Sequence, residues 1–508
     1  MSKFTLPFIV FVTLLWTFAW PSHAKYTELF KQQVIPLDFT VTQPVLAADV
    51  LVDEGIELIV VGVDEQQQRT LLILKSNPET GQYIAHESIA IDPKAFAYDV
   101  GEVDHTGLQS LYFLSKDLVT RYIPTHMSHP AKMLEEERVS SLYLVNVADV
   151  FIHQNFIQDI NNDGLNDLVL QSFESLNLWL SDCCGLRHPQ QLPIDSRIEM
   201  EEDRVSFYEN ELFFEDMNFD GKSDLIIVEQ GALQVFLQQS DMQFSIEPTL
   251  IPLAQTIHGL NWWDMKGPNG RGLNQSDLEH RTVKKITDLN GDGIPDLAVQ
   301  FTQSSGVLDK NIEFEFYFGQ KQEQKLKYLE EANTSVEWDE TLSGLAFVDL
   351  EDDGIQEVFV SSFDIGISQI IGALLSGGID QDVLVFAMDE NGQYQKKPLV
   401  SQEVEMTFSL SQGATGEPLI KVVDVNGDTF KDILFSDGDS AIRVLFATPD
   451  GKKPYARRSL RQKMTMPQNA SSIDSVDLNK DGKSDLVIHY GQLDAEELHK
   501  QIVVLLAK

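Results

Sequence analysis

One acidic loop recurs six times along this sequence and limits the folds that the chain can adopt. The best preserved copy reads DLNGDGIPDL over residues 288–297, with three aspartates and one asparagine within nine residues. In most copies the order is Asp, any residue, Asn, any residue, Asp, Gly, two residues and an acid, followed by an aliphatic stretch. The copies begin at Asp159, Asp216, Asp288, Asp349, Asp424 and Asp477. Their recurrence at intervals of 53 to 75 residues indicates a repeat architecture in which each unit is one supersecondary structure.

Two weaker copies extend the series toward the N-terminus and bring the number of units to eight. The segment from Glu102 keeps the glycine but has lost most of its carboxylates, and the segment from Asp49 has a loop that is one residue short. In each unit a short strand enters the loop, the aliphatic strand leaves it, and a further strand follows. Three or four antiparallel strands per ~60 residues is the content of a propeller blade. The sequence therefore predicts an all-β fold, a β-propeller of seven or eight four-stranded blades with eight favoured, and with the acidic loops in β-hairpins.

The two ends of the chain indicate how the ring closes. The last unit stops after the strand-like segment 501–508 and lacks the strands that should complete it. The segment that begins at Tyr26 resembles the missing piece. N-terminal strands that pair into the last blade would leave no exposed sheet edge, whereas an open solenoid would need no such complement. We therefore expect one propeller domain over 25–508, closed by its N-terminal strand or strands.

The acidic loops need a cation, because three or four carboxylates within nine residues repel one another. We number the loop residues 1 to 9 from the first aspartate. Side chains at positions 1, 3, 5 and 9 and the carbonyl at position 7 supply hard oxygen ligands, and glycine at position 6 permits a sharp turn, which favours Ca²⁺ over zinc or copper. An EF-hand shares the first ligands but needs a glutamate at position 12, which is apolar in every copy. Asp, Asn and Gly also form simple turns, but that alternative leaves the acid at position 9 of all six copies unexplained.

We therefore predict about five or six structural Ca²⁺ sites. The copy from Asp424 has Thr429 in place of the glycine at position 6, and the copies from Glu102 and Asp49 are expected to bind no metal. The predicted ligands are Asp159, Asn161, Asp163, Leu165, Asp167, Asp216, Asn218, Asp220, Lys222, Asp224, Asp288, Asn290, Asp292, Ile294, Asp296, Asp349, Glu351, Asp353, Ile355, Glu357, Asp424, Asn426, Asp428, Phe430, Asp432, Asp477, Asn479, Asp481, Lys483 and Asp485.

The first 24 residues have the pattern of an export signal. Lys3, a short apolar core and a small-x-small ending at Ala24 predict cleavage after residue 24, and a retained membrane anchor is the alternative. The mature chain is then expected in the periplasm or outside the cell, with no stable membrane span. The full sequence has 79 acidic and 38 basic side chains and a net charge of −41, which argues against nucleic acid and anionic membranes as partners. The only cysteines, Cys183 and Cys184, are adjacent and form either thiols or a vicinal disulfide.

Two long intervals between loops contain candidate partner-binding residues. Trp262 and Trp263 lie in a glycine-rich segment, where they either stack on a sugar ring or anchor the segment to the propeller. The segment 365–376 has the spacing of a short amphipathic helix, which either docks a partner or packs across the propeller. Its apolar face comprises Ile367, Ile370, Ile371 and Leu374.

The six loops resemble those of the FG-GAP/VCBS repeat family, and the resemblance extends over nearly all of 25–508. It implies a propeller with Ca²⁺ in hairpin loops on one face and with ligand binding on another surface. We found no nucleophile elbow, phosphate-binding loop or nucleophilic cysteine, so the first hypothesis is an exported binding or scaffold protein for protein or carbohydrate partners. The alternatives are a polysaccharide lyase or hydrolase built on a propeller and a periplasmic envelope-assembly factor.

Overall fold

The computed structural model describes residues 27–508 except 53–54, 126–129, 143–149, 201–203, 268–269, 307–308, 364–376, 410–413, 418 and 449–453. The predicted export signal and the predicted amphipathic helix lie outside the described residues. No helix among the described residues is long and apolar enough to cross a bilayer.

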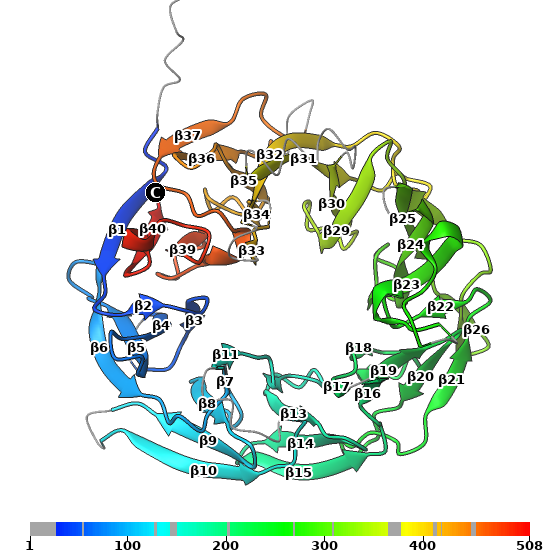
Figure 1. Cartoon of the computed structure of the whole chain (residues 1–508), viewed down its shortest axis with the longest axis horizontal. Helices are drawn as coiled ribbons and strands as arrows, with labels where there is room; N and C mark the ends of the chain where they lie inside the picture. The colour runs from blue at the N-terminus through cyan, green and yellow to red at the C-terminus, as the bar shows by residue number, and fades with distance from the viewer. Residues whose placement is uncertain are drawn as a thin grey trace, which may run out of the picture.

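Eight sheets of four or five strands are arranged as blades around an open centre, which confirms the eight-bladed propeller (Figure 1). Blades 1 and 2 comprise β2 (Thr40–Val41), β3 (Leu46–Ala48), β4 (Glu57–Val63), β5 (Arg69–Ser76) and β6 (Tyr83–Ala90), then β7 (Ala97–Gly101), β8 (Ser110–Leu114), β9 (Leu118–Ile123), β10 (Lys132–Arg138) and β11 (Ile152–His153). Blades 3 and 4 comprise β12 (Ile157–Gln158), β13 (Asp167–Gln171), β14 (Leu176–Asp182) and β15 (Gly185–Leu192), then β18 (Phe213–Glu215), β19 (Asp224–Glu229), β20 (Ala232–Phe236) and β21 (Thr249–Pro252).

The second half of the ring repeats this arrangement. Blades 5 and 6 comprise β22 (Ile257–His258), β23 (Leu278–Thr287), β24 (Asp296–Gly306), β25 (Asp309–Tyr317) and β28 (Thr334–Val336), then β29 (Thr341–Val348), β30 (Glu357–Phe363), β31 (Gly378–Phe386), β32 (Val400–Ser409) and β33 (Ala414–Thr415). Blades 7 and 8 comprise β34 (Ile420–Val423), β35 (Asp432–Ser436), β36 (Ala441–Leu445) and β37 (Leu460–Lys463), then β38 (Ile473–Val476), β39 (Asp485–His489), β40 (Gln501–Ala507) and β1 (Phe30–Pro36).

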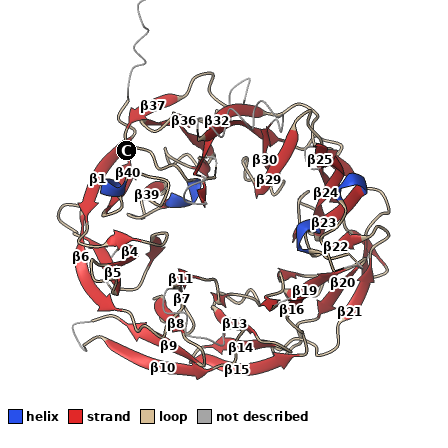
Figure 2. Ribbon diagram, in the orientation of Figure 1, coloured by secondary structure: helices blue, strands red, loops and turns tan. Residues whose placement is uncertain are grey.

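Short hairpins and a few short helices lie outside the blade sheets (Figure 2). Two separate hairpins consist of β16 (Arg197–Met200) with β17 (Val205–Tyr208), and β26 (Gln320–Gln322) with β27 (Lys325–Lys327). The described helices are single 3₁₀ turns, η1 (Trp262–Asp264), η2 (Gln275–Asp277), η3 (Ala470–Ser472) and η4 (Glu496–Leu498).

The core is divided among the blades, with one apolar cluster between each adjacent pair. Because each sheet packs against two neighbours, both faces of its middle strands are buried, and strands such as β13 and β39 are continuous runs of buried residues. Eight clusters between eight sheets leave no unpartnered blade face among the described residues.

The N-terminal strand completes the last blade. β1 pairs antiparallel with β40 from Phe30↔Ala507 to Pro36↔Gln501. The side chain of Gln462 on β37 accepts hydrogen bonds from the backbone N–H of Leu29 (2.6 Å) and of Phe30 (2.8 Å). The first described strand is therefore attached to both of the last two blades.

Candidate metal centres

The six acidic loops lie in blades 3 to 8 and share one backbone conformation. Each loop joins two adjacent antiparallel strands, which are β12 and β13, β18 and β19, β23 and β24, β29 and β30, β34 and β35, and β38 and β39. In each loop the position-1 aspartate accepts a hydrogen bond of 2.7–2.9 Å from the backbone N–H of position 6. Position 6 has a left-handed φ in all six copies, which glycine adopts freely and a β-branched residue only with strain. Thr429 has φ 76° and still donates to Asp424. The loop from Asp424 therefore has the same turn as the others despite its missing glycine.

Position 4 is a second left-handed position that the sequence analysis did not identify. Its φ is positive in all six loops, and only two of the six residues are glycines. These residues are Asn162, Phe219, Gly291, Asp352, Gly427 and Lys480. The two glycines indicate a left-handed φ at this position, but the other four loops have non-glycine residues there, so the sequence shows no consistent pattern.

The position-9 carboxylates are buried and connect the loop to the blade. One oxygen accepts a hydrogen bond from the backbone N–H of position 2 in all six loops. In five loops the other oxygen accepts from an N–H at the end of the next strand but one, or just beyond that strand, as Asp296 does from Gly319 after β25 at 2.8 Å. Each carboxylate oxygen keeps a second lone pair, so these bonds leave an acceptor free for a cation.

The acids within each loop repel one another, and this repulsion affects the pKa of the position-9 acid. Burial raises the pKa of Asp167 to about 7 and that of Asp224 to about 6. The backbone N–H donors lower both values, and the carboxylates at positions 5 and 1 raise them further. The remaining position-9 acids show the same causes. A nearby cation would relieve this repulsion.

The donor set fits Ca²⁺, because positions 1, 3, 5, 7 and 9 supply only oxygen ligands. In five loops the position-3 asparagine donates from Nδ2 to the position-5 aspartate at 2.9–3.3 Å, which places both side chains together. Among the described residues, no loop holds three carboxylates whose oxygens all lie within 4.8 Å of one another. Cation binding would therefore exchange the Asn–Asp hydrogen bond for bonds to the ion. When bound, the ion supplies the positive charge that the loop lacks.

Asp296 tests the structural part of this arrangement. Replacing Asp296 with alanine leaves the N–H groups of Leu289 and Gly319 without an acceptor, so we expect a loss of about 3 kcal/mol in the free energy of unfolding, with or without chelator. The control is Asp292→Ala at the exposed position 5, which should reduce stability only when Ca²⁺ is present. Denaturant unfolding in both buffers measures the two effects. Equal losses for both variants in chelator would contradict the role given to Asp296.

Neighbouring loops are connected through position 8. Ser484 donates its backbone N–H to the Asp424 carbonyl at 2.6 Å, and its Oγ accepts from the Asp424 N–H at 3.1 Å. Asn166 makes the same pair of bonds with Glu102. A change in one loop is therefore transmitted to the first residue of the preceding loop.

The loop from Asp49 requires a correction. Glu57 accepts hydrogen bonds from the N–H groups of Val50 and Leu51 at 2.9 Å and is buried. It therefore occupies position 9, and the loop is not one residue short. A longer glutamate had concealed the register, although the spacing from Asp49 is the usual one.

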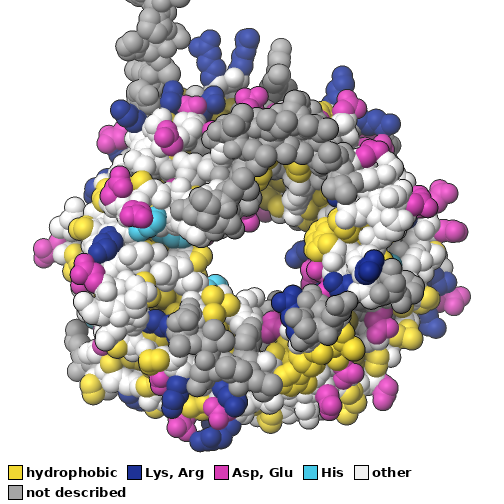
Figure 3. Space-filling model, viewed as in Figure 1, with side chains coloured by type: hydrophobic (Ala, Val, Ile, Leu, Met, Phe, Trp, Pro, Cys, Tyr) yellow, Lys and Arg dark blue, Asp and Glu magenta, His cyan; other side chains and the backbone are white. Residues whose placement is uncertain are grey.

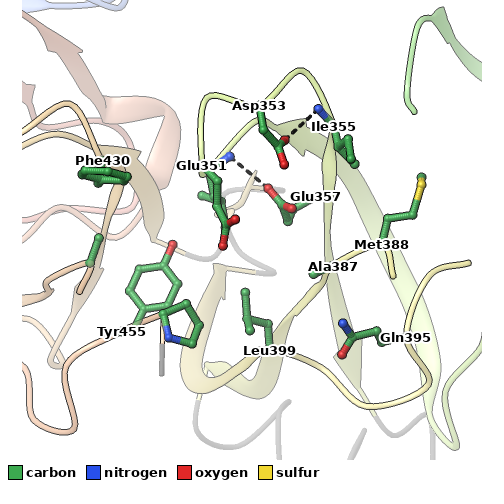
Figure 4. A pocket seen from close by; sticks show the side chains of 13 residues that line it. Glu351, Asp353, Ile355, Glu357, Ala387, Met388, Gln395, Leu399, Phe430 and Tyr455 are labelled. Atoms are coloured by element: carbon green, nitrogen blue, oxygen red, sulfur yellow. Dashed lines mark hydrogen bonds between the residues drawn. The ribbon is translucent and has the colours of Figure 1, made fainter. Parts of the chain in front are cut away.

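A cavity of about 510 Å³ opens beside the loop from Asp349, between blades 6 and 7. Figure 4 shows Glu351 and Glu357 on one side, and Phe430 and Tyr455 across from them. This loop is the one with an acid at position 3 as well as at positions 1, 5 and 9. The cavity thus combines an anionic wall with an aromatic one.

The predicted tryptophan site lies on η1, between the first two strands of blade 5. Trp263 is 52% exposed, and Trp262, which is partly buried, meets it edge to face with ring centroids 5.4 Å apart. The Nζ of Lys284 lies 5.9 Å from the centre of the Trp263 ring. One tryptophan thus anchors the segment and the other presents its ring to solvent.

The β16–β17 hairpin is an exposed apolar element that the sequence analysis missed. Cross-strand partners Ile198↔Phe207 and Met200↔Val205 lie on one face, and all four side chains are exposed. We call these four residues the hairpin face. Figure 1 shows the hairpin between blades 3 and 4, toward the open centre. The opposite face is polar, with Glu199 bound to Lys266 at 2.7 Å. No motif marks this insertion, because the interval that contains it is short.

The adjacent cysteines lie at the tip between β14 and β15. Both are exposed free thiols, with their sulfurs 3.1 Å apart. Asp182, Cys183 and Cys184 are the one described group of three such side chains whose ligand atoms all lie within 4.8 Å of one another. Because both side chains are exposed, they lie outside the apolar core.

Comparisons with known proteins agree with the class of fold. The profile of the FG-GAP-like repeat matches residues 424–488, which contain the last two acidic loops. Together with the eight-bladed ring, this match supports an FG-GAP-like β-propeller. None of the curated proteins compared with the chain matches it.

The solved structures that match this chain are distant in sequence. An Agrocybe aegerita lectin described as recognising non-reducing terminal N-acetylglucosamine is 14% identical, with a TM-score of 0.39, and the match covers 84% of this chain and 94% of the lectin. A V. cholerae biofilm matrix protein is 10% identical, with a TM-score of 0.36 and coverage of 94% and 92%. A Lactobacillus plantarum protein is 10% identical, with a TM-score of 0.35 and coverage of 85% and 97%. These values support no conclusion about ligands.

Proposed function

We propose that this protein is an exported, calcium-stabilised β-propeller that serves as a binding scaffold, with the hairpin face as its contact surface for a partner protein in the periplasm or outside the cell. The calcium part rests on six oxygen-donor loops with one geometry. The binding part rests on a single observation, the exposed apolar face of β16–β17. A scaffold of this kind needs a rigid ring and a surface element that differs from the repeat.

The hairpin face concentrates exposed apolar side chains in one place. It and Tyr208 supply five of the sixteen large apolar side chains that are exposed in the described part of the chain. Figure 3 shows acidic and basic side chains distributed around the ring, as expected for a soluble surface. Clustered apolar side chains exposed to water favour a protein contact, because association removes them from solvent.

A carbohydrate partner is the second candidate, and Trp263 carries it. A half-exposed indole with an ammonium group beside it can stack on a sugar ring and bind an acidic substituent. Lys266 links this segment to the polar face of the hairpin, so the two surfaces are neighbours.

Photo-crosslinking tests whether the hairpin face contacts a partner protein. A photoreactive amino acid at Met200 in the native cells should yield an adduct with a partner protein, whereas the same group at Ile246, which is 60% exposed on blade 4, should not. The paired substitution Ile198→Ser and Phe207→Ser should abolish the adduct and, because both side chains are exposed, change the melting temperature by less than about 2 °C. Equal labelling from Met200 and Ile246, or an adduct that survives the paired substitution, would remove the hairpin face from the proposal.

A further inference from the structure

The loop Glu102–Ser110 in blade 2 keeps the shape of the acidic loops but has fewer carboxylates. His105 at position 4 and Gly107 at position 6 have left-handed φ values of 51° and 74°. Glu102 at position 1 accepts a hydrogen bond from the Gly107 N–H at 2.6 Å, as the aspartates do in the other loops. Positions 5 and 9, however, are Thr106 and Ser110. Two acids therefore remain where the other loops have three or four.

An arginine side chain joins two of the metal-ligand positions of this loop. The Nη2 of Arg121 donates to Asp104 at position 3 over 2.8 Å, and its Nε donates to Ser110 at position 9 over 2.9 Å. The side chain of Arg121 is 13% exposed. None of the acids in the six complete loops has a Lys or Arg partner within ion-pair distance among the described residues.

The position of Arg121 is apolar in every other blade. Arg121 on β9 pairs with Tyr112, the second residue after position 9. The residue with the same register in each of the other blades is buried and apolar. These residues are Ile73, Leu178, Val235, Phe316, Val385, Val444 and Val504. A buried guanidinium group is unfavourable unless it is paired with hydrogen-bond acceptors or an acid. The neighbouring loop supplies these partners to Arg121.

Blade 2 also lacks the backbone donor that binds the position-9 aspartate in other blades. In five calcium loops the residue three beyond this register donates its N–H to the position-9 aspartate, as Gln238 does to Asp224. In blade 2 that residue is Pro124, which has no N–H. An aspartate at position 9 would lack this donor, whereas Ser110 is bound by Arg121 instead.

We propose that the Arg121 guanidinium occupies the cation position of the loop Glu102–Ser110, so that blade 2 has a built-in positive charge and needs no Ca²⁺. Two acids and one arginine leave one net negative charge, as do three acids and one Ca²⁺. This inference rests on the proposed calcium role of the other loops. The ion pair between Lys480 in the blade 8 loop and Asp49 in the blade 1 loop is a weaker parallel, because Lys480 is 58% exposed.

Rebuilding the loop tests whether the guanidinium and a metal compete for one position. A first variant, Thr106→Asp with Ser110→Asp, restores acids at positions 5 and 9, and a second variant adds Arg121→Leu, the residue type at Leu178. Bound calcium per folded chain is measured by equilibrium dialysis, after circular dichroism and gel filtration confirm the fold. We expect one more ion than in the wild type only when Arg121 is replaced. An additional ion in the variant that keeps Arg121 would overturn the proposal.

A second experiment measures melting temperatures in the absence of calcium. Its result therefore does not depend on whether the other loops bind calcium, as the proposed function requires. In chelator, Arg121→Met should lower the melting temperature by about 5 °C, because it leaves Asp104 unpaired. Arg138→Met, at a side chain that is 77% exposed, should lower it by less than about 1 °C. Adding Asp104→Asn to Arg121→Met should recover part of the loss. An unchanged melting temperature, or no recovery, would contradict the pairing even if the wild type were found to bind no calcium.

Discussion

Chelation of calcium should lower the melting temperature of the mature chain, residues 25–508, by more than about 10 °C, with about six ions bound per chain beforehand. A ligand that binds only the folded state stabilises it by ~3 kcal/mol per site at a hundredfold excess over Kd, and six sites add. The loops lose their compensating charge together when the ion is removed. Differential scanning calorimetry with excess Ca²⁺ and with chelator, alongside elemental analysis, measures both quantities.

The expected effect is large because the loops are not independent. Three or four carboxylates in each loop lack a basic partner among the described residues. Ser484 at position 8 of the last loop is hydrogen-bonded to Asp424 at position 1 of the preceding loop, so distortion of one of these two loops affects the other.

A single substitution provides the matched control for the chelation experiment. Asp220→Asn at the exposed position 5 of the second loop should remove one bound ion and shift the melting temperature by a fraction of the full effect. Readdition of Ca²⁺ after chelation should restore the wild-type value, whereas Mg²⁺, which prefers a smaller octahedral site, should not. A wild-type melting temperature that does not respond to chelator would mean that the loops are turns and would end the calcium proposal.

The fold could be predicted because its main signal is periodic. Each loop such as Asp288–Asp296 fixes one β-hairpin, and the aliphatic strands after it are buried on both faces. The choice between seven and eight blades needed the two weak copies, since only packing shows that β4 and β8 belong to complete sheets with their own apolar clusters.

The candidate sites were less predictable, for physical reasons that differ from case to case. Position 4 was missed because a left-handed φ is accepted by Asn162 and Lys480 as well as by glycine. The hairpin face has alternating apolar residues that resemble any half-buried strand. Arg121 lies eleven residues after its serine partner, and only the strand register brings its guanidinium to the loop.

Deletion of β1 should be the most damaging change to the chain outside the loops. Removing residues 25–36 exposes the edge of β40, whose seven residues pair with β1 and are mostly aliphatic. An exposed, apolar edge strand pairs with other chains, so we expect soluble aggregates or dimers in place of the monomer. Gel filtration with light scattering measures the state of the truncated protein.

Complementation in trans makes this last expectation specific to ring closure. A synthetic peptide of residues 25–38 should restore the monomer and most of the melting temperature, because it supplies the strand that pairs with β40 and the backbone groups that bind Gln462. A peptide with Val34→Pro, which removes a backbone N–H in the middle of the strand, should restore neither. If the truncated chain stays monomeric with the wild-type melting temperature, then β1 only covers the last blade, and the contacts between blades 8 and 1 hold the ring closed without it.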